Sequence, residues 1–442
     1  MTQTVSRGRT RRRPRPVSPL RERLRDSFWF APVLGLLGAI VFSGLTTAAD
    51  KMLVELLRDA GESDAIDNLL KISDDAKRLL NTVGSSMLTF IGVVFSISLV
   101  ALQMAASQFT PRVLRLYVRS RITKATFAVF LATFTFALLA QLGYETDTDP
   151  ATVTSVPVVS GAVGIVLVMI SLLLFIAYVH STLRLMRVTQ VIDRVARESL
   201  AVLGGHALLA VSEERAVLPP VTGEIVYSGP AGVLRGINVG RLTRLARRYD
   251  AVLRLEPRIG DFIVTGTPVC TVHGGTFPAD RRRLRSAFQV GVERTFHQDL
   301  GFGLRQLSDI ALRALSPALN DPTTAVQALD RIHQLLAALV ARPLGEVHHR
   351  DRSGTLRLVQ QLPRWPDLLD LALVEIRGCG SAAPQVTRRM FALLDDLLLS
   401  APEERRASLL RHRALLVQSV ARAQPDPADR EFSVHPDRQG IG

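Results

Sequence analysis

Four long apolar segments dominate the first 180 residues of the chain. A helix needs about 17–25 apolar residues to cross the hydrocarbon core of a bilayer, and each segment falls in that range. None holds Asp, Glu, Lys or Arg in its interior. The pattern predicts a transmembrane bundle of four helices over residues 28–181, with spans at about 28–48, 87–107, 125–142 and 156–178.

The pattern around and after these spans changes twice. Residues 65–83 show helical spacing and are expected to run into the second span, with an interruption near Gly84. The fourth span is expected to continue as a helix into 182–214. Alternating residues then predict a small β-rich module, and helical periodicity returns after it. The predicted fold class is a membrane all-α bundle plus an α+β region. The β module is expected over residues 215–275 and a helical domain over 276–424. Disordered tails are expected over 1–27 and 425–442.

The positive charge is concentrated at particular places in the chain. The formal net charge is +14, and the tail before the first span is rich in arginine. The loop 109–124 has five basic and no acidic residues, whereas the loop 144–150 is acidic. Positive loops mark the cytoplasmic side, so both termini and the region after residue 182 are expected in the cytoplasm of a bacterium, with the spans in its plasma membrane. The arginines are expected to contact anionic lipid headgroups, and nucleic acid is not an expected partner.

Three strings carry a resemblance to a known family. They are VVFSISLVALQMAASQFTPRVLR in the second span, GDFIVTGTPV in the β module and QDLGFGLRQLSDIALRALSPALNDPTTA in the helical region. In this order, behind four spans, they resemble a bacterial family of predicted membrane proteins of unknown function (domain of unknown function 2254). The resemblance extends from about Phe28 to about Val420. It implies a membrane protein and brings no activity or catalytic residues.

The second span carries polar and small residues on one face. At 100° per residue the following fall in a wedge of roughly 60°: Ser85, Thr89, Gly92, Ser96, Gln103 and Ser107. Polar groups avoid lipid, so this stripe is expected to face protein or water. Small and hydroxyl residues also suit tight packing between helices. The sequence leaves both hypotheses open, a packing stripe or the lining of a pore, and Gln103 favours the pore because its amide is long.

A pore hypothesis assigns selectivity to the ends of the path. Arg112, Arg115 and Arg119 share a helical face after the second span and are expected at a cytoplasmic mouth, where they would favour anions. Four modest helices enclose a poor cavity alone, so a homo-oligomer is expected. The leading hypothesis is a channel-like protein for ions or small solutes with a cytoplasmic regulatory region. The alternative is a non-conducting scaffold or sensor that binds a cytosolic partner or ligand.

The turn ALSPALNDPTTA, residues 314–325, is the second candidate site. Asp321 is placed to cap a helix that starts at Pro322, and Ser316, Asn320 and Thr323 add polar groups to the turn. A rigid helix–helix turn is the favoured interpretation. A small anion or cation site is the alternative.

Enzymatic chemistry finds little support in the sequence. His297 with Asp299, and His348 with His349, lack metal-ligand spacing, and the second pair is expected in a solvated loop. No nucleophile elbow, phosphate-binding loop or dinucleotide fingerprint occurs. No lysine stands at a hairpin tip of the β module, which argues against a swinging-arm cofactor. We therefore expect no enzyme, no cofactor and no metal.

Overall fold

The computed structural model describes the chain in two compact units. It describes residues 29–60, 63–108, 121–142, 155–185, 187–206, 211–275 and 286–439. The first unit holds the four apolar helices, and the second begins at Arg187. Of the two tails expected to be disordered, residues 1–27 lie outside the described ranges, whereas most of 425–442 lies within them.

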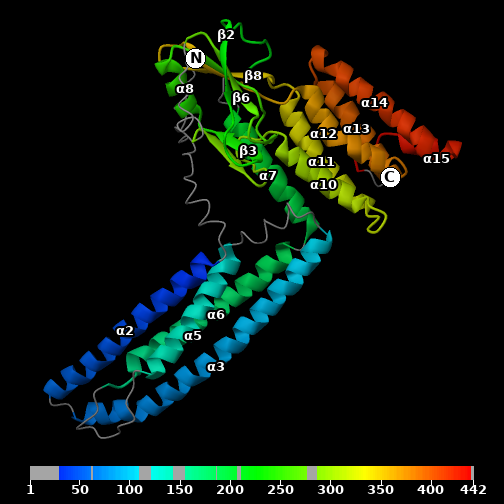
Figure 1. The fold of residues 1–442 in the computed structure, drawn as a ribbon. Coiled ribbons are helices and arrows are strands. Elements are labelled where there is room, and N and C mark those ends of the chain that lie inside the picture. The colour runs from blue at the N-terminus through cyan, green and yellow to red at the C-terminus, as the bar shows by residue number, and fades with distance from the viewer. Residues whose placement is uncertain are drawn as a thin grey trace, which may run out of the picture. The chain divides into compact units, whose positions relative to one another are not determined.

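The first unit contains the four predicted apolar helices, which run side by side (Figure 1). Each is long and apolar enough to cross a membrane. The first and second of these helices extend well beyond the expected spans, because polar turns continue each helix. Their bounds are α2 (Phe30–Asp59), α3 (Ser63–Gln108), α5 (Arg121–Leu142) and α6 (Val158–Leu185).

Helix α3 confirms the expected continuation of residues 65–83 into the second span. The interruption expected near Gly84 does not occur, because this glycine is buried and packs near Ala137 of α5, which holds the helix in place. The fourth helix does not continue as one element. Arg187 is not helical, and a separate helix α7 (Val188–His206) follows in the second unit.

Apolar side chains of α3, α5 and α6 form the core of the first unit. Leu80 packs with Phe136, and Met87 packs with Ala137. Val94 lies against the buried Tyr178 of α6. The buried positions of α3 recur every three to seven residues, so one face of this helix is committed to the bundle.

A close approach between α2 and α5 depends on Gly35. A Cβ added at Gly35 would lie 2.6 Å from the backbone oxygen of Ala128, whereas one added at Gly38 meets nothing within 4 Å. We expect Gly35→Ala to destabilise the first unit by about 1–3 kcal/mol, because backbone atoms must move apart. Gly38→Ala, the matched control, should be neutral or mildly stabilising, since alanine favours helix. Melting temperatures of the two purified variants in detergent test this; equal values would contradict the packing.

The start of α6 is capped by a carboxylate from another helix. Asp50 of α2 is fully buried. Its oxygens accept hydrogen bonds from the backbone N–H groups of Val159 (2.7 Å) and Ser160 (3.2 Å) and from the Ser160 hydroxyl (2.6 Å). The first N–H groups of a helix have no partner within it, and a negative charge there is favoured by the helix dipole. Asp50 therefore locks α2 to the first turn of α6.

Two sheets form the β part of the second unit in the described residues. The larger has the strand order β1-β8-β9-β4-β6-β2, and the smaller β5-β3-β7. Neighbours are antiparallel except β4 and β9. The strands are β1 (Val211–Ser212), β2 (Val221–Val226), β3 (Gly232–Ile237), β4 (Val252–Leu255), β5 (Phe262–Ile263), β6 (Pro268–His273), β7 (Phe288–Gly291), β8 (Glu346–Arg350) and β9 (Leu356–Gln361).

The predicted helical domain over 276–424 is wrong in part. Strands β7, β8 and β9 fall inside it and complete the two sheets begun by residues 215–275. The β part also contains a short helix, α8 (Val239–Arg248), whose cap residue Asn238 accepts a hydrogen bond from the Arg241 N–H. The error has a physical cause: strands gain their backbone partners from distant segments, which local periodicity does not reveal.

Helices form the remainder of the second unit. They are α10 (Phe302–Ala314), α11 (Pro322–Leu339), α12 (Trp365–Gly380), α13 (Pro384–Ser400) and α14 (Glu403–Ala423). Helix α7 packs against α10 and α11. Each helix from α10 to α13 buries an apolar stripe, so these helices share one core.

The tail expected to be disordered over 425–442 contains a packed helix, α15 (Pro427–Val434). Asp426 caps it by accepting from the Ala428 N–H, and Pro427 starts it. The Thr387 hydroxyl donates to the Ser433 carbonyl, and the Arg388 guanidinium lies 4.1 Å from the Phe432 ring centre. These contacts with α13 outweigh the polar, proline-rich composition that suggested disorder.

Candidate functional site

The polar stripe of α3 lies on the face turned away from its own bundle. Thr89, Gly92, Ser96 and Gln103 are all exposed, while the residues that pack on α5 and α6 lie on the opposite side. A Cβ at Gly92 would meet nothing within 4 Å. The Ser107 side chain lies outside the described residues. Among the described residues, the stripe is therefore not part of the packed face of α3.

Two hydroxyl groups of this stripe form hydrogen bonds with backbone carbonyls of their own helix. The Thr89 hydroxyl lies 3.4 Å from the Ser85 carbonyl oxygen, and the Ser85 hydroxyl donates to the Asn81 carbonyl at 3.1 Å. Ser and Thr often bond to their own helix in this way. A glutamine amide carries two donor hydrogens and a carbonyl acceptor, and it is the costliest group of the stripe to leave in hydrocarbon. Gln103 is therefore the residue of the stripe whose exposure to lipid would cost the most free energy.

Hydroxyl groups of the third and fourth spans face inward instead. Thr126 and Thr133 of α5 and Ser171 of α6 are buried, and the Thr133 and Ser171 hydroxyl oxygens lie 3.2 Å apart. The Tyr178 hydroxyl lies 2.5 Å from the Ser98 hydroxyl and donates to the Val94 carbonyl at 3.1 Å. These groups join α3, α5 and α6 within the chain, which is the packing role that hydroxyls commonly have in membrane helices.

The expected cytoplasmic mouth lies outside the described part of the chain. Arg112, Arg115 and Arg119 all fall in residues 109–120, between α3 and α5.

The turn between α10 and α11 uses its polar groups internally. Asp321 accepts from the Thr324 N–H (3.0 Å) and from the Thr324 hydroxyl (2.5 Å), and Pro322 starts α11. The Ser316 hydroxyl donates to the Arg313 carbonyl, and Asn320 adopts a positive φ of 44°. Thr323 is exposed. The predicted cap is confirmed, and both Asp321 oxygens serve it.

Two of the three histidines singled out in the sequence lie in a strand. His348 and His349 belong to strand β8, so the expected solvated loop is wrong; they pair with β9 in the larger sheet. Asp299 is buried, holds Arg294 and caps α10 through the N–H groups of Gly301 and Phe302. Among the described residues, no group of three His, Cys, Asp or Glu side chains is arranged to hold a metal ion.

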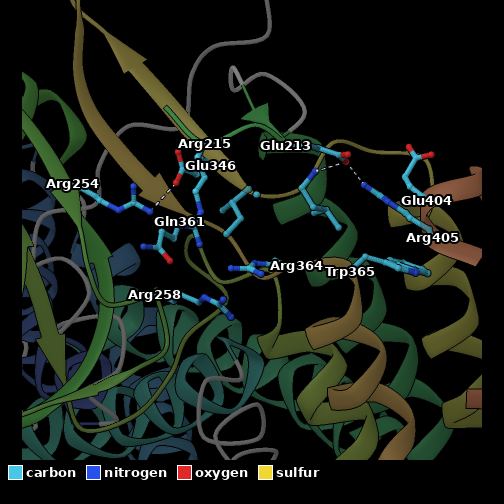
Figure 2. Close-up of a pocket in the computed structure, with 13 residues that line it drawn as sticks. Glu213, Arg215, Arg254, Arg258, Glu346, Gln361, Arg364, Trp365, Glu404 and Arg405 are labelled. Atoms are coloured by element: carbon cyan, nitrogen blue, oxygen red, sulfur yellow. Dashed lines mark hydrogen bonds and ion pairs between the residues drawn. The ribbon is translucent and has the colours of Figure 1, made fainter. Parts of the chain in front are cut away.

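An arginine-rich cavity in the second unit was missed by the sequence reasoning. It has a volume of about 370 Å³ and lies where the larger sheet meets the first turns of α12 and α14 (Figure 2). Its charged lining comes from segments nearly 200 residues apart, so no local motif announces it. Five arginines and three glutamates line it: Arg215, Arg254, Arg258, Arg364, Arg405, Glu213, Glu346 and Glu404.

Two ion pairs shape the walls of this cavity. The Arg254 guanidinium lies 2.9 Å from a carboxylate oxygen of the buried Glu346, and the Ala216 N–H donates to the other oxygen. Burial alone would raise the pKa of Glu346, but the Ala216 amide, Arg254 and His348 together hold it below its usual value. Opposite, Arg405 pairs with Glu213. Glu346 therefore stays ionised at neutral pH and fixes one wall.

Comparisons with known proteins give the chain its relatives. A family model described as "Predicted membrane protein (DUF2254)" matches residues 25–396. An uncharacterized protein of Mycobacterium bovis is 31% identical over 374 residues, which are 80% of this chain and 70% of the relative. An uncharacterized protein of Mycobacterium tuberculosis strain H37Rv matches to the same extent. No solved structure matches. The resemblance noted in the sequence is thus confirmed, and the chain belongs to this family of predicted membrane proteins.

Proposed function

We propose that the protein is a non-enzymatic, oligomeric membrane channel through which ions or small solutes pass along a path lined by α3. The observation that carries the proposal is the exposed polar stripe on a helix otherwise suited to lipid, above all Gln103. Polar groups that face hydrocarbon raise the energy of a span, and several copies arranged around a shared path relieve that cost.

The chemistry of the stripe suggests what would pass. Thr89, Ser96 and Gln103 are neutral, so the centre of the path would select weakly by charge. Selection would then lie at the ends, where the sequence places Arg112, Arg115 and Arg119 on the expected cytoplasmic side. Arginines at a mouth attract anions and repel cations. We therefore propose small anions as the preferred permeant species, in a bacterial plasma membrane with both termini and the second unit in the cytoplasm.

Ion flux from liposomes tests this proposal. Purified protein is reconstituted, and chloride efflux is compared for the wild type, Gln103→Leu and Ser96→Leu. Phe95→Leu, at an exposed apolar position of the same helix, is the matched control. We expect wild-type flux, a change of about threefold or more in the stripe variants and less than twofold in the control, because only the stripe would meet the permeant.

The size of the assembly must be measured on the same samples. Light scattering of each variant in detergent separates a changed path from a changed number of copies. Flux that is absent from every sample across voltage, pH and osmotic challenge would contradict the channel. Flux that the stripe variants leave unchanged at equal oligomeric state would contradict the lining.

A sensor or scaffold is the second candidate, and the arginine-lined cavity favours it. A non-conducting membrane protein with this cavity would transmit the binding of a cytosolic ligand to the membrane unit. Absence of flux together with ligand binding to the second unit would support this alternative.

A further inference from the structure

The arginines of the cavity differ in how firmly other protein groups bond their guanidinium groups. Arg405 is only 5% exposed, and it donates to the carbonyls of Leu339, Val340 and Arg342 as well as pairing with Glu213. Arg254 is held by the buried Glu346. Four protein groups thus bond the Arg405 guanidinium, whereas the carboxylate of Glu346 bonds that of Arg254, and both side chains are held in place.

Three further arginines line the same cavity and make fewer ion pairs and hydrogen bonds with the protein. Arg215 and Arg364 make no ion pair with a carboxylate in the part of the chain that the structure describes, and both are exposed. Arg258 forms an ion pair with Asp367, whose side chain is 43% exposed. In Figure 2 the side chains of Arg254, Arg258 and Arg364 gather on one side of the cavity, and the pair Glu213–Arg405 lies on the other. The lining therefore carries more positive than negative charge, and the two guanidinium groups without a carboxylate partner among the described residues are open to a ligand.

The remaining lining narrows the chemistry of a ligand. Leu344, Leu362 and Trp365 add apolar surface, and Glu404 offers an acceptor at the rim. The volume lies within the range of small-molecule sites, about 300–1,000 Å³, and exceeds what one inorganic ion fills. Guanidinium groups match phosphate oxygens with paired hydrogen bonds, which lysine does not do.

We propose that this cavity binds a phosphate-bearing organic molecule through Arg215, Arg258 and Arg364, with Arg254 and Arg405 as fixed supports. The phosphate can belong to a soluble nucleotide-sized molecule or to a lipid headgroup, since the arginines recognise the same group in both. The site does not depend on the proposed channel, because every residue of it lies within the second unit.

Binding of defined phosphates to the full-length protein in detergent tests the proposal. The probes are ATP, pyrophosphate and inorganic phosphate, measured by calorimetry and by the rise in melting temperature that a bound ligand causes. We expect ATP or pyrophosphate to bind more tightly than inorganic phosphate. The double variant Arg215→Gln/Arg364→Gln should weaken that binding about tenfold or more, since two charge-assisted contacts are lost.

The control removes a charge elsewhere on the same unit. Arg352 lies in an exposed turn outside the cavity. Arg352→Gln should change the affinity for the phosphate probes by less than about twofold, because salt screens the effect of a distant surface charge. Should the double variant fail to fold, Arg215→Lys/Arg364→Lys keeps both charges and removes only the paired geometry, so a smaller but measurable weakening is expected. Equal affinity in wild type and in the folded cavity variant would overturn the site.

The lipid source is distinguished with nanodiscs. The protein is placed in discs of phosphatidylcholine alone or with phosphatidylglycerol, and its melting temperature is compared for the wild type and the double variant. Stabilisation by phosphatidylglycerol that the double variant loses assigns the site to a headgroup, and binding of soluble phosphates alone assigns it to a soluble ligand. If neither soluble phosphates nor phosphatidylglycerol act on the wild type, the proposal is wrong.

Discussion

Replacing Arg405 by methionine is expected to lower the free energy of unfolding of the second unit by about 3–5 kcal/mol. The guanidinium of Arg405 donates to three carbonyls, those of Leu339, Val340 and Arg342, where α11 ends and the chain leaves it. The last carbonyls of a helix have no partner within it. Methionine keeps much of the volume but leaves these buried acceptors unpaired, and it also leaves Glu213 without its cation.

The neighbouring arginine provides the control for this prediction. Arg406 is on the same helix but exposed, and its contact with Glu403 is a surface ion pair at 3.4 Å. Arg406→Met should therefore change the free energy of unfolding by less than about 1 kcal/mol. Urea unfolding is followed by the fluorescence of Trp365, which lies under Arg405, in a Trp29→Phe background that silences the chain's other tryptophan. Equal midpoints for the two variants would show that Arg405 does not hold the end of α11.

Replacing Asp50 by alanine is expected to destabilise the first unit by about 2–4 kcal/mol. Two backbone N–H groups at the start of α6 and the Ser160 hydroxyl lose a buried acceptor at once. Asp50→Asn should cost less, since the amide keeps one oxygen acceptor while its nitrogen faces donors. The loss separates α2 from α6 at one end of the bundle.

Glu55→Ala serves as the matched control for Asp50, because Glu55 is exposed on the same helix. The measurement is the temperature at which the detergent-solubilised protein loses its monodisperse peak on size exclusion. Asp50→Ala should lower this temperature clearly, and Glu55→Ala should leave it within the error of the wild type. A lowered value for both variants would mean that removing any acidic charge from α2 has this effect.

Much of the membrane unit could be predicted because its determinants are local. The length and hydropathy of a span are properties of consecutive residues, and hydrogen bonds within each helix satisfy the backbone. The cap at Asp321 and the cap at Asn238 were also predictable, because an acceptor side chain bonds an N–H group three residues away. Asp50 escaped prediction because the N–H groups that it caps lie more than 100 residues away.

The errors in the second unit have a common origin. Strands β8 and β9 were read as part of a helical domain, yet β9 pairs with β4, about 100 residues earlier in the chain. Helix α15 was hidden by its proline-rich start, although Asp426 followed by Pro427 is a signal for a helix beginning. The arginine-lined cavity needed segments from Glu213 to Arg405 to meet, and no spacing in the sequence encodes that.

The sequence by itself determined the four apolar helices, the alternation of strands in the β module and the fact that polar residues of the second span share one face. Each follows from the fixed geometry of a helix or a strand, in which neighbours three, four or two residues apart lie together. Only the tertiary structure decided that this face of α3 points away from its own bundle, that Asp50 closes the start of α6 and that five arginines surround one cavity. Those outcomes depend on which distant surfaces bury each other, and burial is a property of the packed chain rather than of any local segment.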